Sequence, residues 1–477
     1  MKKILFAVLL LSLVLAAAYT GASYWAGTLA QEQYEAAIAK TVQPNVIVSG
    51  KSYDRGVFQS TAVTLITVRA AGYGQAGEDT FRFALSNTIA HGPLARVRSG
   101  SGDQEIKPVQ AVITTRLSPG PENDTTLSKI LETIPELLSS ELVTAIKLDG
   151  SGESFLDIPS FNKKLMNEKN REVAIEWSGL KGDTRFGSSL TDISGSFSSP
   201  ALRIADSEAR LTITDMSAVF AAHPGAKGIS VGASTLKCGS FDFHSVEDNT
   251  RARLESPVIK AESSDSGETA RGSLIASFDK LAVNGDSFGP FVFDLELRKL
   301  DISTILLFEQ NLKNLQKQLP TKSGEEIQGL FTECYTQLLT GLITKSPELE
   351  LKQLKLGTPM GDVSAGLKIS IGESGAALPN LLIALAGASA SLEAAISEPL
   401  LSFFLENSFR ADFTKKEGLG QEAAKLKAAQ KAREVISTLL DQRIVIRDGD
   451  GIRSSATYQA GKLVINGRGL NLMELLR

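Results

Sequence analysis

The chain has 477 residues, and its 50 Lys and Arg side chains against 54 Asp and Glu leave a formal net charge of −4. This near balance argues against a nucleic-acid partner, because a protein that binds nucleic acid presents a basic domain. Two cysteines, Cys238 and Cys334, are too few for a disulfide scaffold. Either they pair in an oxidising compartment, or Cys334 belongs to the apolar face of a helix.

The first thirty residues carry the most informative pattern. Lys2-Lys3 precede a stretch without charge that runs from Ile4 to Ala30. About 20 apolar residues in a helix cross a bilayer of roughly 30 Å, and Tyr24-Trp25 lie where aromatic residues gather at a membrane surface. The pattern favours a retained single-pass anchor in a bacterial inner membrane, with the bulk of the chain in the periplasm. The alternative is a signal peptide cleaved near residues 16–18.

Apolar and polar side chains alternate with a period of two at many places, which predicts half-buried antiparallel strands. The clearest examples are residues 81–86, 291–298, 348–356 and 367–371. Near the C-terminus, residues 443–447, 452–458 and 462–466 are separated by turn sequences and predict a closing β-meander.

Helical patterns interrupt these strands. Leu127–Leu142 is the first, and an apolar stripe from Ile305 to Leu319 is the second. Ser323-Gly-Glu-Glu326 is a capping box that starts a partner helix. We expect this hairpin to pack on itself and on a sheet, or to form a lid over an apolar groove. Gln421–Leu440 is a further helix, whose basic side chains form a solvated face or contact anionic headgroups.

Together these patterns predict a β-dominated α+β fold. We expect an elongated, curved antiparallel sheet with inserted helices and one N-terminal transmembrane helix. The predicted divisions are a signal anchor at residues 1–30, a β-rich periplasmic body at 31–345 that ends in the helical hairpin, and a C-terminal strand and helix region at 346–477 that closes with the meander.

Motifs of known chemistry are weak. Gly285-Asp-Ser-Phe-Gly289 matches the nucleophile elbow of hydrolases, which needs a helix directly after the serine and a histidine later in the chain. Pro290 and a strand pattern follow instead, and the last histidine is His244, so we expect a hairpin turn. The other histidines, His91 and His223, lack the spacing of metal ligands. The sequence therefore predicts that the chain has no catalytic, cofactor-binding or metal-binding residues and is not an enzyme.

Three elements carry a family resemblance. Tyr53-Asp-Arg-Gly-Val-Phe-Gln-Ser60 is similar to a Y-x-R-G-x-F-x-S element, His91-Gly92-Pro93 to an H-G-P element, and Tyr458–Gly467 to a terminal hairpin. With the N-terminal anchor, and in this order, they resemble the bacterial YdgA-like family of envelope proteins, over most of the chain. The resemblance implies an inner-membrane anchor and a periplasmic β-rich body, and it supplies no catalytic residues.

The motif residues have a structural or partner role in this interpretation. Gly56 permits a bulge or a positive φ between two strands. Arg55 pairs with a carboxylate or caps strand carbonyls. Pro93 has no N–H to donate to a ladder, so His91-Gly92-Pro93 ends a strand, where the imidazole bonds to the backbone. The candidate residues are Tyr53, Arg55, Gly56, Phe58, Ser60, His91, Gly92 and Pro93.

The sequence leaves three classes of function to be compared: a binding or scaffold protein, a lipid carrier and an enzyme. The first hypothesis is a membrane-anchored scaffold or binding protein of the cell envelope, which contacts the inner membrane through residues 4–30 and also another envelope protein. The alternative is a carrier of phospholipid or another hydrophobic ligand, by analogy with the AsmA-like envelope proteins, although fold does not fix function. An enzyme with an unrecognised site is the third. Small residues in the anchor also permit a homodimer.

Overall fold

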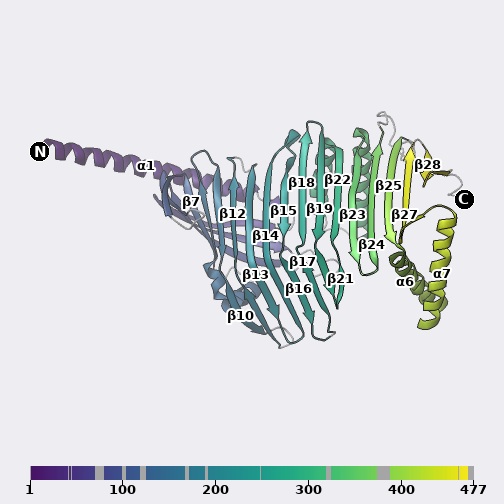
Figure 1. Cartoon of the computed structure of the whole chain (residues 1–477). Helices are drawn as coiled ribbons and strands as arrows, with labels where there is room; N and C mark the ends of the chain where they lie inside the picture. Colours follow the sequence, from purple (N-terminus) through teal and green to yellow (C-terminus); the bar gives the residue numbers. More distant parts are fainter. Residues whose placement is uncertain are drawn as a thin grey trace. The chain divides into compact units, whose positions relative to one another are not determined.

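The computed structural model describes residues 2–40, 42–43, 46–69, 80–98, 104–118, 125–166, 171–188, 192–247, 249–318, 324–372, 387–459 and 461–470. They divide into two compact units, Met1–Pro224 and Gly225–Arg477. Both units consist mainly of antiparallel strands with a smaller number of helices (Figure 1), which confirms the predicted β-dominated architecture. The divisions predicted after residues 30 and 345 stay predictions.

The elements of the first unit are α1 (Lys2–Lys40), β1 (Val42–Gln43), β2 (Val46–Arg55), β3 (Gln59–Arg69), β4 (Thr80–His91), β5 (Leu94–Arg98), β6 (Gln104–Pro108), β7 (Ala111–Leu117), α2 (Thr125–Thr133), η1 (Pro135–Ser139), β8 (Glu141–Ile146), β9 (Gly152–Ile158), β10 (Phe161–Met166), β11 (Glu172–Trp177), β12 (Leu180–Phe186), β13 (Ile193–Ala205) and β14 (Ala209–Pro224).

Its strands pair in the order β1–β2–β3–β4–β7–β8–β9–β12–β13–β14, and every pair is antiparallel. Strand β13 is long enough for two neighbours on one side, since residues 193–198 pair with β12 and residues 202–205 pair with β11, which carries β10. A separate hairpin of β5 and β6 packs Val97 onto Val112 and Val143 of the sheet.

Helix α1 runs without a break from Lys2 to Lys40, beyond the predicted end at Ala30. Its C-terminal part contacts β2, β4 and β7. Residues 4–16 of the predicted anchor have side chains that lie outside the described part. Across the part of the chain that was described, no helix is long and apolar enough to span a bilayer.

The elements of the second unit are η2 (Ala226–Gly228), β15 (Ser230–Lys237), β16 (Ser240–Ser245), β17 (Arg251–Glu255), β18 (Val258–Ser266), β19 (Thr269–Phe278), β20 (Lys280–Val283), β21 (Asp286–Phe288), β22 (Phe291–Asp301), α3 (Ile302–Gln318), α4 (Gly324–Leu342), η4 (Ile343–Lys345), β23 (Glu348–Thr358), β24 (Gly361–Ile371), β25 (Ala388–Ser397), α6 (Glu398–Glu417), α7 (Gln421–Asp441), β26 (Ile446–Asp448), β27 (Gly451–Gln459), β28 (Lys462–Ile465) and β29 (Arg468–Leu470).

The main sheet of this unit has the order β15–β18–β19–β22–β23–β24–β25–β27–β28–β29, all antiparallel, with β26 also paired to β27. The last strands confirm the predicted meander. A shorter group pairs as β16–β17–β20–β21. The predicted hairpin at Gly285–Gly289 is confirmed, because Ser287 lies in β21 opposite Ala282 of β20.

The prediction of one helix over Leu127–Leu142 is wrong beyond its first half. Helix α2 ends at Thr133, a 3-10 turn follows from Pro135, and the chain is already in strand β8 at Glu141. A residue directly before proline avoids the helical region, and Ile134 accordingly has φ −122° and ψ 69°. Pro135 indicates in the sequence that the helix ends here, but the helical spacing of the apolar residues continues past it and led to the longer prediction.

The second predicted pattern is confirmed, because α3 and α4 form a helical hairpin. The rings of Phe308 and Tyr335 lie 5.5 Å apart, and Asn311 donates a hydrogen bond to Gln337. Part of the predicted capping box, Ser323, lies outside the described residues. The packing agrees with the expectation that the two helices contact each other.

Helix α6 was not predicted, whereas α7 confirms the helix expected at Gln421–Leu440. Ser397 caps α6 by accepting a hydrogen bond from the Leu400 N–H, and Gly418 ends it in the left-handed region. In α7 every fourth residue is buried where the two helices pack together. The buried residues are Ala424, Ala428, Ala432 and Ile436. Alanine permits the close approach of the two helices.

The α6–α7 contact generates a test. Ala428 is fully buried, so Ala428→Leu inserts a larger side chain into a filled interface, and we expect a loss of about 1–3 kcal/mol in the free energy of unfolding. The control is Ala423→Leu in the same helix, at an exposed position, where the change stays within about 0.5 kcal/mol. Chemical denaturation of the full chain measures both. Equal effects would contradict the packing.

Candidate functional site

The motif residues predicted from the sequence gather at one place in the first unit. They lie where α1 packs on β2, β3 and β4, a region we call the helix–sheet junction. Tyr53 and Arg55 lie at the end of β2, Phe58 lies in the turn, and Ser60 is the second residue of β3. His91 is the last residue of β4 and is hydrogen bonded to Ser60. The structure thus brings together residues from two separate sequence elements.

His91 lies at the centre of this junction and is almost completely buried, as is Ser60. The Nδ1 atom of His91 lies 3.0 Å from the carbonyl oxygen of Val57, and Nε2 lies 2.9 Å from the Ser60 hydroxyl oxygen. A carbonyl only accepts, so in the neutral imidazole Nδ1 carries the proton and Ser60 donates to Nε2. The expected bond from His91 to the backbone is confirmed.

Gly27 of α1 lies directly on the imidazole. A Cβ atom at this position would be 2.5 Å from the Nδ1 and Cε1 atoms of His91. The same face of the helix presents Ser23, Ala26 and Ala30, all buried. Small side chains at this spacing allow the helix backbone to approach the sheet closely. The sequence reasoning missed Gly27, because the course of α1 over the sheet has no signal in the local sequence.

Two pairs of aromatic side chains lie in the junction. The rings of Tyr34 and Tyr53 lie 5.4 Å apart, and burial raises the pKa of the Tyr53 hydroxyl. The rings of Tyr19 and Phe58 stack with centroids 6.0 Å apart, and the Tyr19 hydroxyl donates to the Leu94 carbonyl oxygen. The motif residues Tyr53 and Phe58 therefore position α1.

Arg55 contacts side chains of α1, and neither a carboxylate nor the carbonyls of a strand, its two expected partners, is among its described contacts. Its guanidinium lies 4.7 Å from the centre of the Tyr24 ring and donates to the hydroxyl oxygens of Tyr24 and Thr28, at 2.6 and 3.1 Å. A cation also binds an aromatic face, an option that neither expectation included. Tyr24 had been assigned to a membrane surface only, so the sequence held no sign of this pair.

The motif glycines permit close approach of the backbone. Gly56 turns the chain between β2 and β3 with its N–H bonded to the Gln59 carbonyl, and its φ is not positive; the bulge of β2 lies between Gly50 and Ser52. Gly92 follows His91, and a Cβ there would lie 1.8 Å from a backbone oxygen. His91-Gly92-Pro93 ends β4 as predicted.

This arrangement resembles a nucleophile and base only superficially. The third group of the Ser60–His91 pair is a backbone carbonyl, and Gly27 covers the imidazole. A buried hydroxyl that already donates to a covered base does not reach a substrate. The chemistry that the junction performs is to hold α1 on the sheet.

A second feature is the apolar face of the main sheet in the second unit. Residues directly opposite each other in antiparallel strands share a face. Two rows of apolar residues follow from the register. The first is Ala261, Leu274, Leu295, Leu351, Leu367, Leu392, Ala456 and Ile465, and the second is Leu236, Ile259, Ala276, Phe293, Leu354, Ala365 and Ala394. None of these side chains is buried.

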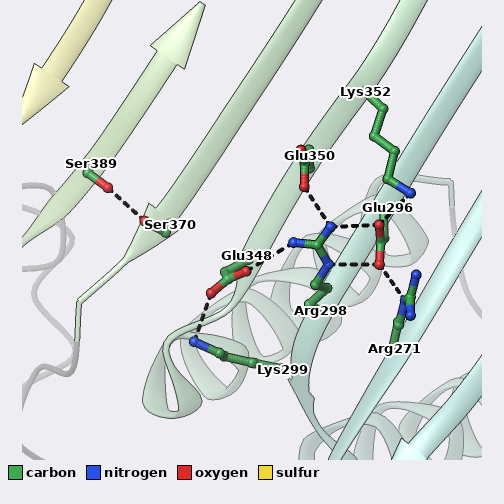
Figure 2. A network of polar contacts seen from close by, with 9 residues as sticks. All are labelled: Arg271, Glu296, Arg298, Lys299, Glu348, Glu350, Lys352, Ser370 and Ser389. Carbon is green, nitrogen blue, oxygen red and sulfur yellow. Dashed lines mark hydrogen bonds and ion pairs between the residues drawn. The ribbon is translucent and has the colours of Figure 1, made fainter.

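The opposite face of the same strands carries a network of charges (Figure 2). Glu296 of β22 is fully buried and lies directly opposite Glu350 of β23. Arg298 binds both, with donor–acceptor distances of 2.7 Å to each oxygen of Glu296 and 2.6 Å to Glu350. Lys352 and Arg271 also pair with Glu296. The cations cancel the repulsion between carboxylates that the register brings together.

The network extends to one edge of a shallow hollow. Lys299 pairs with Glu348 at 2.7 Å, and the Ser370 and Ser389 hydroxyls lie 2.7 Å apart (Figure 2). These four residues line a space of about 510 Å³ together with Gln459. Its acids and bases are already paired, so the hollow offers polar contacts without a free charge.

Metal ligands do not converge in the part of the chain that the structure describes, where no three His, Cys, Asp or Glu side chains form a group that could hold an ion. The three histidines lie in separate strands, β4, β14 and β16. Cys238 and Cys334 are not joined in a disulfide, and the Cys238 thiol donates to the Ser240 carbonyl.

The junction predicts opposite effects for two glycines of α1. Gly27→Ala places a methyl group against His91, so we expect faster hydrogen exchange in β2 and β3 and a lower unfolding temperature. Gly21→Ala is the control, because a Cβ there meets no described atom within 4 Å, and alanine stabilises a helix by about 1 kcal/mol over glycine. Exchange measured by mass spectrometry on the full chain separates them. Equal protection in both variants would contradict the junction.

The charge network predicts a pH dependence. Hydrogen bonds from Arg298 hold the pKa of the Glu296 carboxyl far below its ordinary value. The stabilisation is therefore present above about pH 4.3, the ordinary pKa of a glutamate, and is lost as the pH falls below that value. We expect Glu296→Gln to cost about 2 kcal/mol near pH 7 and to flatten the fall of the unfolding temperature on acidification. Glu172→Gln, in an exposed pair with Lys164, is the control that changes little. An unchanged acid profile in Glu296→Gln would contradict the assignment.

Comparisons with known proteins place the chain in a family. The sequence pattern of a family described as "Bacterial protein of unknown function (DUF945)" matches residues 1–473. No curated protein and no solved structure matches the chain. Because the match spans nearly the whole sequence, this chain belongs to that family of bacterial proteins of unknown function.

Proposed function

We propose that this chain is a tethered binding protein of the bacterial cell envelope, of the YdgA-like type, without catalytic activity. In this proposal residues 4–30 hold it in the inner membrane as a single-pass anchor, and the β-rich body lies in the periplasm. The body binds the acyl chain of a lipid on the apolar face of the second unit. The observation that supports this best is the pair of unburied apolar rows across that sheet.

The apolar rows have the extent and exposure that an acyl chain requires. Leu274 and Leu392 are 38% and 37% exposed, and the leucines between them are half-buried. Soluble proteins rarely expose contiguous apolar patches of more than a few hundred Å² without a binding role. Burial of each methylene of a ligand contributes about 0.8 kcal/mol, so a chain laid across several leucines gains enough to bind.

The two faces of this sheet differ in what they can bind. The face that carries Glu296 and Arg298 is saturated with ion pairs across β19, β22 and β23. These pairs also fix the register, and the register keeps the leucines of neighbouring strands in line. An apolar ligand therefore finds one suitable face.

The helical hairpin does not remove this face from solvent. The first turn of α3 packs at the end of strand β19, where Ile302 lies among Ile229, Val231 and Ala270. A hairpin that filled the sheet would bury the leucine rows, and none of their members is buried. This favours the carrier hypothesis over a scaffold with a closed core.

A scaffold that binds another envelope protein is the second candidate. Its support is the exposure of large apolar side chains on the hairpin, since Leu307, Tyr335 and Leu339 are all more than half exposed. Such residues on helices suit a protein partner. In-cell crosslinking followed by capture of the chain tests this alternative, which fails if no envelope protein is captured reproducibly.

Two neighbouring residues of β25 provide the test of lipid binding. Leu392 belongs to the apolar face, and Ser391 is exposed on the other face, opposite Lys368. Leu392→Glu places a carboxylate among leucines, where it has no partner, so we expect at least about tenfold weaker binding. Ser391→Glu faces a lysine and should bind as the parent does. The measurement is fluorescence of a phospholipid with a labelled acyl chain, titrated with the purified full chain.

Extraction of the parent protein gives an independent readout. Co-purified phospholipid, detected by mass spectrometry and reduced in Leu392→Glu, agrees with the proposal. Equal binding by both glutamate variants, or no lipid in any of them, excludes the apolar face as the site.

A further inference from the structure

The helix–sheet junction ends in a group of apolar side chains that remain exposed. Tyr19 of α1 contacts Phe58 and Leu94 of the body, and Val57 is next to them in the β2–β3 turn. Phe58 is 52% exposed and Leu94 is 48% exposed, and the other two are exposed as well. We call these four residues the rim patch. Apolar side chains with this exposure would be stabilised by contact with an apolar environment.

The length of the uncharged segment indicates what that surrounding is. Residues 4–18 precede Tyr19, which makes the first contact of α1 with the body among the side chains that the structure describes, and as a helix they span only about 22 Å. The hydrocarbon core of a bilayer is roughly 30 Å thick. Extension of the span to Tyr24 gives about 31 Å, which fits. An anchor of this length therefore has to include residues that already touch the body.

The depth of the rim patch follows from this helix. Tyr19 lies five residues before Tyr24 and so about 8 Å deeper along the axis. Phe58 stacks on Tyr19, and the Tyr19 hydroxyl donates a hydrogen bond to the Leu94 carbonyl. Because these contacts are direct, Phe58 and Leu94 lie level with Tyr19. We infer that the rim patch enters the leaflet on the body's side of the membrane, so that the body contacts the phospholipid bilayer directly beside its anchor.

Charge on the same side of the junction suits phospholipid. Arg55 is exposed and forms no ion pair with any residue that the structure describes; it rests on Tyr24 and Thr28. Arg96 shares the outward face of the β5–β6 hairpin with Leu94 and with Ile106, which is directly opposite it. Arginine next to tyrosine and leucine is the composition of a membrane interface, where phosphates meet acyl chains.

This inference rests on the proposed anchor and adds a second membrane contact made by the body. The experiment uses the full chain in bilayer nanodiscs of phosphatidylcholine, either plain or brominated in the upper part of the acyl chain. Bromine quenches tryptophan only at close range. The native tryptophans are Trp25, at the proposed interface, and Trp177 in the sheet. In a background with Trp177→Phe, Trp25 alone reports on the anchor.

The rim patch is then probed with Phe58→Trp in a background that lacks both native tryptophans. We expect the tryptophan at position 58 to lose most of its fluorescence in brominated discs. Leu426→Trp in the same background is the control, at an exposed position of α7 in the second unit, and should keep its fluorescence. Circular dichroism checks that each variant is folded.

Three outcomes would overturn the inference, and they differ in what they say about the anchor. Quenching of Trp25 without quenching at position 58 excludes the rim patch and leaves the anchor intact. No quenching at either position excludes the anchor and with it the rim patch. Equal quenching at positions 58 and 426 indicates adsorption of the whole protein, which excludes a localised contact.

Discussion

The structure depends on the two-sidedness of an antiparallel sheet. Directly opposite residues share a face, so one register decides the lining of both sides across many strands. In the second unit this register places leucines on one side and the Glu296–Arg298 network on the other. A slip by one residue would move Glu296 among the leucines. The ion pairs, which join three strands, oppose such a slip and thereby maintain the apolar face.

In the first unit the corresponding apolar side is closed by a helix. Ala30 of α1 packs with Ala62, Ile89 and Ala111 of the sheet. Such close packing requires small side chains on this face of the helix. Gly27 is the residue that lies directly against His91. The same helix begins as the proposed anchor, so the membrane segment and the body share one continuous rod. The orientation of this unit on a bilayer would then follow from packing rather than from a linker.

Particular residues show how far sequence reasoning reached. The convergence of Tyr53, Arg55, Ser60 and His91 was implied only by their membership in one family pattern. The structure joins Ser60 to His91 and places Tyr53 and Arg55 against side chains of α1. The bond from His91 to the backbone was predicted, because a polar side chain at the end of a strand finds free carbonyls. The partner of Arg55 was not, because it lies on a helix whose course over the sheet has no local signal. Gly27 escaped for the same reason.

Local patterns in the sequence determined strands β4, β22, β23 and β24, the α3–α4 hairpin and the final meander, because a period of two or 3.6 residues is a property of a few neighbouring side chains. They also determined that charged and apolar side chains alternate along β22 and β23. Only the tertiary structure decided which strands are neighbours, that leucine meets leucine across them, and that α1 lies on His91. Those facts depend on contacts between residues far apart in the chain, which no local periodicity encodes.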